Sequence, residues 1–239
     1  MRPDGRRNDE LRPFSFERDF TDAALGSCLV SFGRTRVLCT ASVGDGVPRW
    51  LSGTNKGWVT AEYSMLPGSS AERIRRRVSG RSQEIQRLVA RSLRAVCDLG
   101  ALGEREVTVD CDVIQADGGT RTASICGGYI ALHDALERLV AAGDLAANPL
   151  TDHLAAVSVG IIDGEARLDL PYVEDAGAEV DFNVVMTGLG RFVEVQGTAE
   201  GEAFERSQLD ELVDLAAGGI AEIVAAQRTL LADPPPARG

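Results

Sequence analysis

Short runs of apolar and β-branched residues, separated by glycine, proline and polar residues, dominate the beginning of the chain. Two of these runs flank the Gly33-Arg34 turn, which predicts a β-hairpin. Another alternates strictly between valine or cysteine and a polar residue, which is typical of a strand with one buried face. The predicted strands of the first half are 28–32, 36–43, 58–63 and 107–113.

Apolar residues at helical spacing predict three helices: one over about 82–99, one ending near residue 142, and one over about 208–231. Ser207, with Asp210 three residues later, is the expected N-cap of the last helix. The predicted buried stripe of the first helix is Ile85, Leu88, Val89, Leu93 and Val96, and the core candidates of the second are Ile125, Ile130, Leu132, Leu136 and Leu139.

A segment with glycine and proline, 143–151, separates two regions in which strands are followed by a helix. This order indicates an α+β protein, because a parallel α/β fold would alternate strands and helices strictly. We expect two similar halves, 1–145 and 152–231, each a sheet with helices packed on it, and a disordered tail over 232–239. The predicted strands of the second half are 156–163, 166–170, 181–187 and 191–196.

The composition of the 239 residues, 44% hydrophobic and 26% charged, is that of an ordinary globular protein. No uninterrupted apolar run approaches the roughly 18 residues of a membrane span. The N-terminus is polar and lacks an apolar signal segment, so a cytoplasmic location is expected. Five cysteines without a C-x-x-C pair favour buried thiols in a reducing compartment over disulfides or a zinc site. With only two histidines, a histidine-rich metal site is not expected.

The net charge of −11 hides a segregation of charge along the chain. Between Arg73 and Arg94 stand eight arginines and one acid, Glu84, so this window carries +7 and the remainder −18. Of the 25 basic residues, only Lys56 is not an arginine, and the planar guanidinium binds phosphate in a bidentate way that lysine cannot match. Two interpretations stay open here: a solvated helix face or an anion-binding strip.

The segment Asp117-Gly-Gly-Thr-Arg-Thr-Ala-Ser124 lies between a predicted strand and a predicted helix. Two glycines permit a tight turn with exposed N–H groups, and the helix start adds further donors. Thr120 and Arg121 supply a hydroxyl and a guanidinium, so the segment is a candidate phosphate cradle without the P-loop signature. The alternative is a glycine-rich turn followed by a threonine N-cap.

Carboxylates concentrate between Asp163 and Asp181, where seven acids face one arginine, Arg167. Asp175 is predicted in a loop, and Asp181 opens the strand that follows. Two such carboxylates can converge on Mg²⁺, which prefers oxygen ligands, or one of them can transfer a proton. The alternative is an acidic surface loop.

Seven stretches of the sequence together carry the signature of one enzyme family. The longest is Asp110-Cys-Asp-Val-Ile-Gln-Ala-Asp-Gly-Gly-Thr-Arg-Thr-Ala-Ser124, and the others are 2–6, 37–42, 57–67, 84–88, 179–185 and 194–201. Through them the chain, from residue 1 to about residue 231, resembles the bacterial ribonuclease PH family. These enzymes are phosphate-dependent 3′-to-5′ exoribonucleases that trim transfer RNA 3′ ends.

The resemblance implies two similar halves of the type shared with polynucleotide phosphorylase and the exosome ring, and a homohexamer built as a trimer of dimers. It implies that inorganic phosphate, the co-substrate, is bound by Arg81 and by Gly119, Thr120 and Arg121. It places Asp175 and Asp181 on the catalytic side that serves Mg²⁺ and the leaving group. The chain departs from polynucleotide phosphorylase relatives at Asn183, where they carry a lysine, and its loop between Pro67 and Gly80 is short.

The expected substrates are precursor transfer RNA and other RNA 3′ ends, including ribosomal RNA, with nucleoside diphosphates as products. The residues expected to contact the RNA backbone are Arg73, Arg75, Arg76 and Arg77. Two other functions are alternatives. A non-catalytic RNA-binding ring subunit would lack an arginine or aspartate of the site, and a small-molecule kinase would need a glycine-rich ATP loop followed by serines, which the sequence does not contain.

Overall fold

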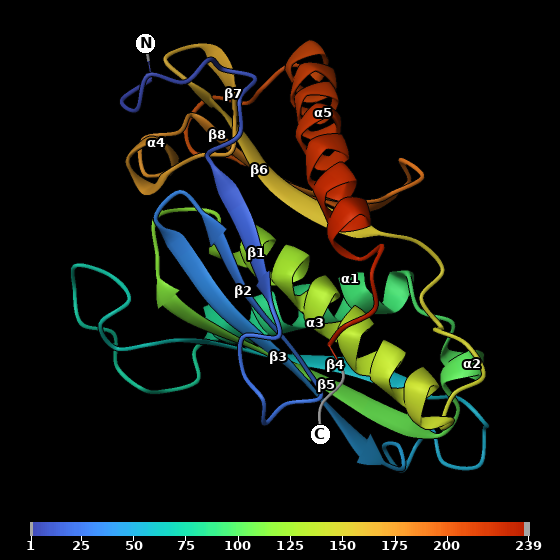
Figure 1. The fold of residues 1–239 in the computed structure, drawn as a ribbon. Coiled ribbons are helices and arrows are strands. Elements are labelled where there is room, and N and C mark those ends of the chain that lie inside the picture. Colours follow the sequence, from blue (N-terminus) through green and yellow to red (C-terminus); the bar gives the residue numbers. More distant parts are fainter. Residues whose placement is uncertain (1, 237–239) are drawn as a thin grey trace.

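The computed structural model describes residues 2–236, which form two β-sheets with helices packed on them (Figure 1). The first sheet has the strand order β1-β2-β3-β5-β4, antiparallel except for the parallel pair β4 and β5. Its strands are β1 (Phe14–Arg18), β2 (Gly26–Phe32), β3 (Thr35–Asp45), β4 (Trp58–Met65) and β5 (Arg105–Gln115). The helices of this half are α1 (Gly80–Ala95), α2 (Leu99–Leu102) and α3 (Thr120–Ala142).

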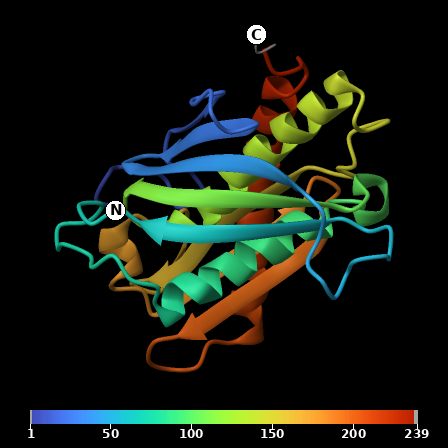
Figure 2. The same ribbon diagram turned by 90° about the horizontal axis from the view of Figure 1, so that it is seen from below.

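One face of the first sheet forms a core with the helices. In β3 and β5 the apolar partners Cys39 and Cys111 lie opposite each other, whereas the neighbouring pair Thr40 and Asp110 points to the other face. Helix α3 packs on β2 and β3, α1 packs on β4, and the two helices contact each other. Figure 2 shows α1 running alongside β4. All five residues of the predicted apolar stripe in α1 are buried, so that prediction is confirmed.

The second sheet has the order β7-β6-β8-β9, with all neighbours antiparallel. Every residue of β6 is buried, because α3 packs against this strand and the C-terminal helix α5 packs against it as well. Helix α3 therefore lies between the two halves, which explains why nearly all of its residues from Thr120 to Leu136 are buried. The elements of this half are β6 (Leu154–Ile162), β7 (Glu165–Leu168), α4 (Tyr172–Asp175), β8 (Val180–Thr187), β9 (Phe192–Ala199) and α5 (Arg206–Leu230).

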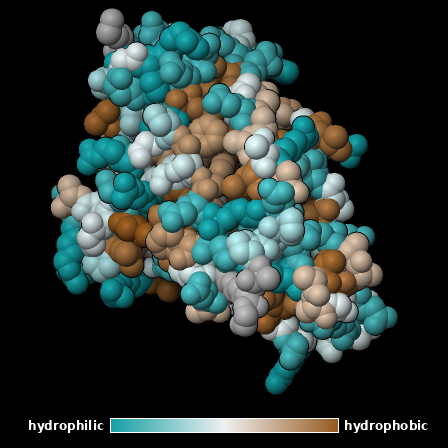
Figure 3. Space-filling model, in the orientation of Figure 1, coloured by the Kyte–Doolittle hydropathy of each residue, from teal (hydrophilic) through white to brown (hydrophobic). Residues whose placement is uncertain are grey.

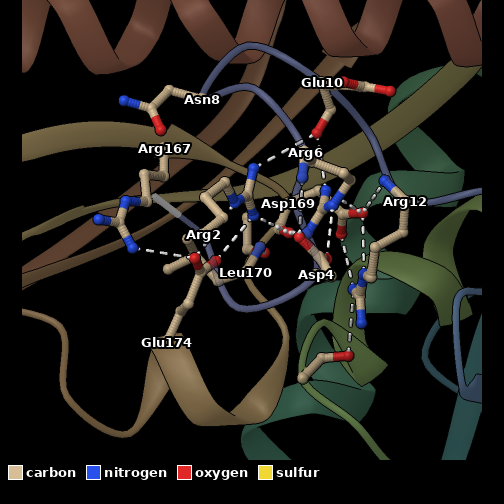
Figure 4. Close-up of polar contacts among 12 residues, drawn as sticks. Arg2, Asp4, Arg6, Asn8, Glu10, Arg12, Arg167, Asp169, Leu170 and Glu174 are labelled. Carbon is tan, nitrogen blue, oxygen red and sulfur yellow. Dashed lines mark hydrogen bonds and ion pairs between the residues drawn. The ribbon is translucent and has the colours of Figure 1, made fainter.

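Residues 2–12, which we call the N-terminal strap, cross from the first half to β7 and α4 of the second (Figure 1). Arg2 of the strap turns inward and donates to both carboxylate oxygens of Glu174, at 3.1 and 2.7 Å, and Arg167 of β7 donates to the same carboxylate at 3.0 Å (Figure 4). All three side chains are at most 5% exposed. The outer surface around the strap and β7, at the top of Figure 3, is mainly hydrophilic.

The α+β class is confirmed, and each of the eight predicted strands corresponds to a strand of the structure, but β1 was not predicted. Three further local predictions are wrong. Helix α1 begins at Gly80, because the Ser79 hydroxyl accepts the Ser82 N–H at 3.1 Å and caps the helix two residues before the predicted start. It ends at Ala95, and a separate turn, α2, follows because Asp98 caps the N–H groups of residues 100 and 101.

The other two errors concern the second half. Ser207 is not the N-cap of α5, which begins at Arg206, where the Gln208 side chain accepts the N–H of Glu205 at 2.8 Å. Asp175 does not lie in a loop but ends the short helix α4, whose first residue follows Pro171. The backbone N–H of Asp175 donates to the carbonyl of Pro171 at 3.0 Å, which closes one turn of helix.

Three further expectations concern the chain as a whole. The five cysteines are buried free thiols, as expected. No helix within residues 2–236 is long and apolar enough to cross a membrane. In the predicted tail, the carbonyls of Asp233 and Pro236 accept hydrogen bonds from Arg18 and Arg138, whereas 237–239 lie outside the described residues. The half boundaries and the tail's disorder stay predictions.

Replacing Glu174 by alanine is expected to lower the free energy of unfolding by about 3–5 kcal/mol, because it leaves Arg2 and Arg167 buried without their carboxylate. Urea unfolding measures the loss. The matched control is Glu165→Ala, which removes a 55% exposed partner of Arg167 and is expected to change the free energy of unfolding little, because solvent screens the pair. Equal losses in the two variants would contradict a supporting role for the buried cluster.

Candidate active site

The turn that precedes α3 is built on two consecutive glycines in the left-handed backbone region, Gly118 at φ +73° and Gly119 at φ +66°. A Cβ atom on Gly118 would lie 2.3 Å from the carbonyl oxygen of Leu170, so the turn presses directly against the second half. This is the tight turn that the sequence predicted, and its close contact with the other half requires glycine.

Helix α3 begins without a side-chain cap, since its N-cap residue is Gly119. The first N–H groups of a helix have no partner within the helix, and they lie at the positive end of its dipole. In α1 the Ser79 hydroxyl accepts one of these groups, but at α3 no side chain does. An uncapped, glycine-led helix start of this kind is suited to bind an anion such as phosphate.

The side chains of the predicted cradle take different directions. Thr120 is buried, and its hydroxyl lies 2.8 Å from the hydroxyl of Tyr63 on β4. Burial raises the pKa of Tyr63, so this phenol stays protonated and able to donate. The Thr122 hydroxyl donates back to the carbonyl of Gly119 at 2.9 Å, which stabilises the turn.

Arg121 is oriented by residues from both halves. Its Nη1 donates to Oε1 of Gln196 on β9 at 2.9 Å and to Oε1 of Glu84 on α1 at 3.2 Å. The guanidinium is 13% exposed, so it is held in place yet open on one side. Gln196 lies in the matched stretch 194–201, but no local pattern marks it as a site residue, and none predicts the contact made by Glu84.

Arg81 lies in the first turn of α1 and is exposed. A cavity of about 400 Å³ joins it to the preceding loop, and this cavity is lined by Tyr63, Arg75, Arg76, Arg77 and Arg81 among others. Arg73 belongs to the same exposed loop but does not line the cavity. Among the described residues, no ion pair involves any of these five arginines, so their charges are available to an anionic ligand.

The second half contributes Asp175 from the end of α4 and Asp181 from β8. Burial raises the pKa of Asp175, and burial together with the charge of Asp175 raises the pKa of Asp181 to about 6. The charges of Arg81 and Arg121 act on both carboxyls in the opposite direction. The fold therefore brings two arginines of the first half and two aspartates of the second into one electrostatic neighbourhood.

One oxygen of Asp181, Oδ1, is buried and has no hydrogen-bond partner among the described residues. A buried acceptor left unpaired is costly, and such atoms mark positions where a proton or a ligand belongs. No cluster of three or more histidine, cysteine or acidic side chains suited to a metal ion occurs within residues 2–236. Two carboxylates alone still fit Mg²⁺ that arrives with a phosphate substrate, because this ion keeps several waters and takes few protein ligands.

Comparison with known proteins shows which family the chain belongs to. Two family models match the chain, the first domain of the 3′ exoribonuclease family over residues 10–136 and its second domain over residues 152–219. Ribonuclease PH of Mycobacterium ulcerans (strain Agy99) is 58% identical over 241 residues, which cover 98% of this chain and 93% of the relative. The chain belongs to the ribonuclease PH family. The expectation of an exoribonuclease of this family, drawn from the seven matched stretches, is confirmed.

Two solved structures superpose on nearly all of the chain. The exosome of Archaeoglobus fulgidus with RNA bound to the active site matches with a TM-score of 0.82, covering 95% of this chain and 92% of that chain at 23% identity. Rice Rrp46 matches with a TM-score of 0.77, covering 96% and 100% at 22% identity. These likenesses confirm two halves of the ribonuclease PH type.

Replacing Asp181 by asparagine is expected to stabilise the ligand-free protein at pH 8, on the order of 1 kcal/mol because the side chain is only partly buried. The folded pKa of about 6 lies above the ordinary value of 3.8, so the destabilising effect of the carboxyl is absent below about pH 4, develops between about pH 4 and 6, and levels off above pH 6. Urea unfolding at pH 4, 6 and 8 measures this. The control is Asp163→Asn, at a side chain that is 86% exposed. Its effect on the free energy of unfolding is expected to be the same at all three pH values. An Asp181→Asn gain that does not grow with pH would contradict the assignment.

Proposed function

We propose that the chain is a phosphate-dependent 3′-to-5′ exoribonuclease that trims the 3′ ends of precursor transfer RNA and releases nucleoside diphosphates. One observation carries this proposal. The uncapped start of α3 lies with Arg81 and Arg121 in the first half, and these groups meet Asp175 and Asp181 of the second half, whose pKa values are raised. Family membership and the 58% identity to a ribonuclease PH support it independently.

Phosphate bound by Arg81 and by Gly119, Thr120 and Arg121 is the nucleophile. One of its oxygens attacks the phosphorus of the last phosphodiester, the bond from that phosphorus to the preceding 3′ oxygen breaks, and a nucleoside diphosphate leaves. The shortened RNA keeps a 3′ hydroxyl, and the reverse reaction adds a nucleotide from a nucleoside diphosphate. No enzyme nucleophile is needed, so the contribution of the protein is positioning and charge stabilisation.

The 3′ oxygen that leaves must gain a proton or have its negative charge offset. Asp181 is suited to protonate it, because its pKa of about 6 keeps part of the population protonated near neutral pH. Asp175 and Asp181 are also the residues that would hold Mg²⁺, and the ion would supply charge stabilisation at the phosphoryl oxygens. The orphaned Oδ1 of Asp181 supports both roles.

RNA would approach over the exposed loop that carries Arg73, Arg75, Arg76 and Arg77. Arginine contacts to phosphates position a nucleic acid without reading its sequence, which suits an enzyme that shortens many 3′ ends, ribosomal RNA included. A homohexamer built as a trimer of dimers is the proposed assembly, as the resemblance to the ribonuclease PH family implies. A cytoplasmic location stays a prediction.

The decisive experiment incubates the protein with a 3′-extended transfer RNA, with and without inorganic phosphate, and separates nucleoside diphosphates from monophosphates. Diphosphate release that depends on phosphate is the expected result. Monophosphate release without phosphate would mean hydrolysis and would overturn the proposal.

In the same assay, Arg81→Ala and Arg121→Ala are each expected to raise the KM for phosphate roughly 10- to 100-fold or to abolish turnover. Each change removes a charge-assisted contact worth about 1.5–3 kcal/mol. Arg206→Ala, at an 82% exposed position on α5, is the control and is expected to leave the KM unchanged. Unchanged phosphate dependence in both site variants would refute the cradle.

Replacing Arg75, Arg76 and Arg77 together by alanine is expected to weaken transfer RNA binding and to flatten its salt dependence. Each lost phosphate contact reduces the slope of log K against log salt by roughly 0.7–0.9. Binding titrations at several salt concentrations measure the slope, and size-exclusion chromatography checks the assembly. A variant that dissociates instead would show that these arginines form a subunit contact.

A further inference from the structure

The turn Asp117–Gly119 is fixed by two side chains to which the proposed function assigns no role. Arg12 of the N-terminal strap donates through Nη1 to the carbonyl of Asp117 at 2.5 Å and through Nη2 to that of Gly118 at 3.5 Å. Thr35, the first residue of β3, donates its hydroxyl to the carbonyl of Gly118 at 2.7 Å and accepts the N–H of Asp117 at 2.9 Å. Thr35 is completely buried.

These contacts determine where the donors of the turn point. A peptide unit is planar and trans, so the carbonyl of one residue and the N–H of the next point in opposite directions. Binding the carbonyl of Asp117 therefore aims the N–H of Gly118 away from Arg12, and binding the carbonyl of Gly118 does the same for the N–H of Gly119. With both residues at positive φ, the direction of these donors depends on the side chains behind them.

Arg12 is itself held by the second half. Its Nε and Nη2 donate to the two carboxylate oxygens of Asp169 at 2.9 and 2.6 Å, and its backbone N–H donates to the same carboxylate at 2.8 Å (Figure 4). Both side chains are 4% exposed. Asp169 has φ +54°, a strained conformation for a residue with a Cβ, and its carbonyl accepts hydrogen bonds from Arg2 and Arg6 at 3.0 and 3.1 Å.

The segment that follows Asp169 lies against the turn. The next residue, Leu170, directs its carbonyl oxygen at Gly118, and α4 with Asp175 begins two residues later. The charge of Arg12 also acts to lower the pKa of Asp175, against the larger effect of burial. One guanidinium thus lies between the phosphate turn and the acidic segment.

We propose that Arg12 and Thr35 are positioning residues for phosphate binding. They orient the N–H groups of Gly118 and Gly119 toward the bound phosphate, and Arg12 links this orientation to the second half through Asp169. The inference rests on the proposed function, since it names the residues that make the cradle competent. Neither side chain needs to touch the phosphate.

The sharpest test compares Thr35→Val with Thr35→Ser. Valine keeps the shape of threonine and removes both hydrogen bonds to the turn, whereas serine keeps the hydroxyl. We expect Thr35→Val to raise the KM for phosphate about tenfold, with the KM for RNA and the kcat at saturating phosphate changed by less than about twofold. We expect Thr35→Ser to match the wild type.

Arg12→Lys provides an independent arm. Lysine keeps a positive charge beside Asp169 but cannot bind a carboxylate and two carbonyls at once, so the KM for phosphate is again expected to rise about tenfold. Arg7→Ala, at a strap residue whose side chain is 76% exposed, is the control and is expected to change nothing. Melting temperatures are recorded for all variants.

The outcomes separate positioning from a merely structural role. A lower melting temperature with an unchanged KM for phosphate in Thr35→Val would overturn the proposal, and so would a Thr35→Ser variant as impaired as Thr35→Val. If Arg12→Lys does not fold, the threonine pair decides alone. Calorimetric titration with inorganic phosphate provides a readout without turnover. A wild type that binds phosphate but does not release nucleoside diphosphates refutes the proposed function. Equal phosphate affinity in the wild type and in Thr35→Val refutes the positioning role.

Discussion

Arg12 and Asp169 form a buried ion pair between a segment of the first half and a segment of the second, with nitrogen–oxygen distances of 2.6 and 2.9 Å. Removing either partner would leave an uncompensated charge in the interior, which costs about 3–5 kcal/mol, so the two halves have one favourable relative placement. The guanidinium also binds the carbonyls of Asp117 and Gly118. The geometry of the candidate site therefore depends on how these charges pair, as well as on the apolar packing of α3 and β6.

The arginines of this protein divide by whether they have a partner. Arg2, Arg12 and Arg167 are buried and bound to carboxylates, and they join the strap to the second half. The arginines of the loop before α1 are exposed and have no ion pair within residues 2–236, as is also true of Arg81. A net charge of −11 does not reveal this division, because it sums charges that are neutralised inside the protein with charges that are available to RNA.

The acids also divide into buried carboxylates bound to arginines and carboxylates of the site, and two adjacent residues belong to different groups. Glu174 is buried against Arg2 and Arg167, while its neighbour Asp175 has a raised pKa and faces the positive charges of the site. The structural carboxylate fixes the short helix α4 and so places the functional one. Asp181 completes the pair on β8, where the unpartnered Oδ1 and the pKa of about 6 suit it to exchange a proton.

The sequence by itself determined the strands other than β1, the buried stripe of α1 and the glycine turn before α3, because these follow from local periodicity and from the backbone freedom of glycine. Its family motifs also marked Arg81, Arg121, Asp175 and Asp181. Only the tertiary structure decided that Asp175 ends a helix, that Gln196 and Glu84 orient Arg121, and that Arg12 binds Asp169. The last two residues are 157 positions apart, and no local pattern encodes a contact between charges that meet only when two sheets have packed around α3.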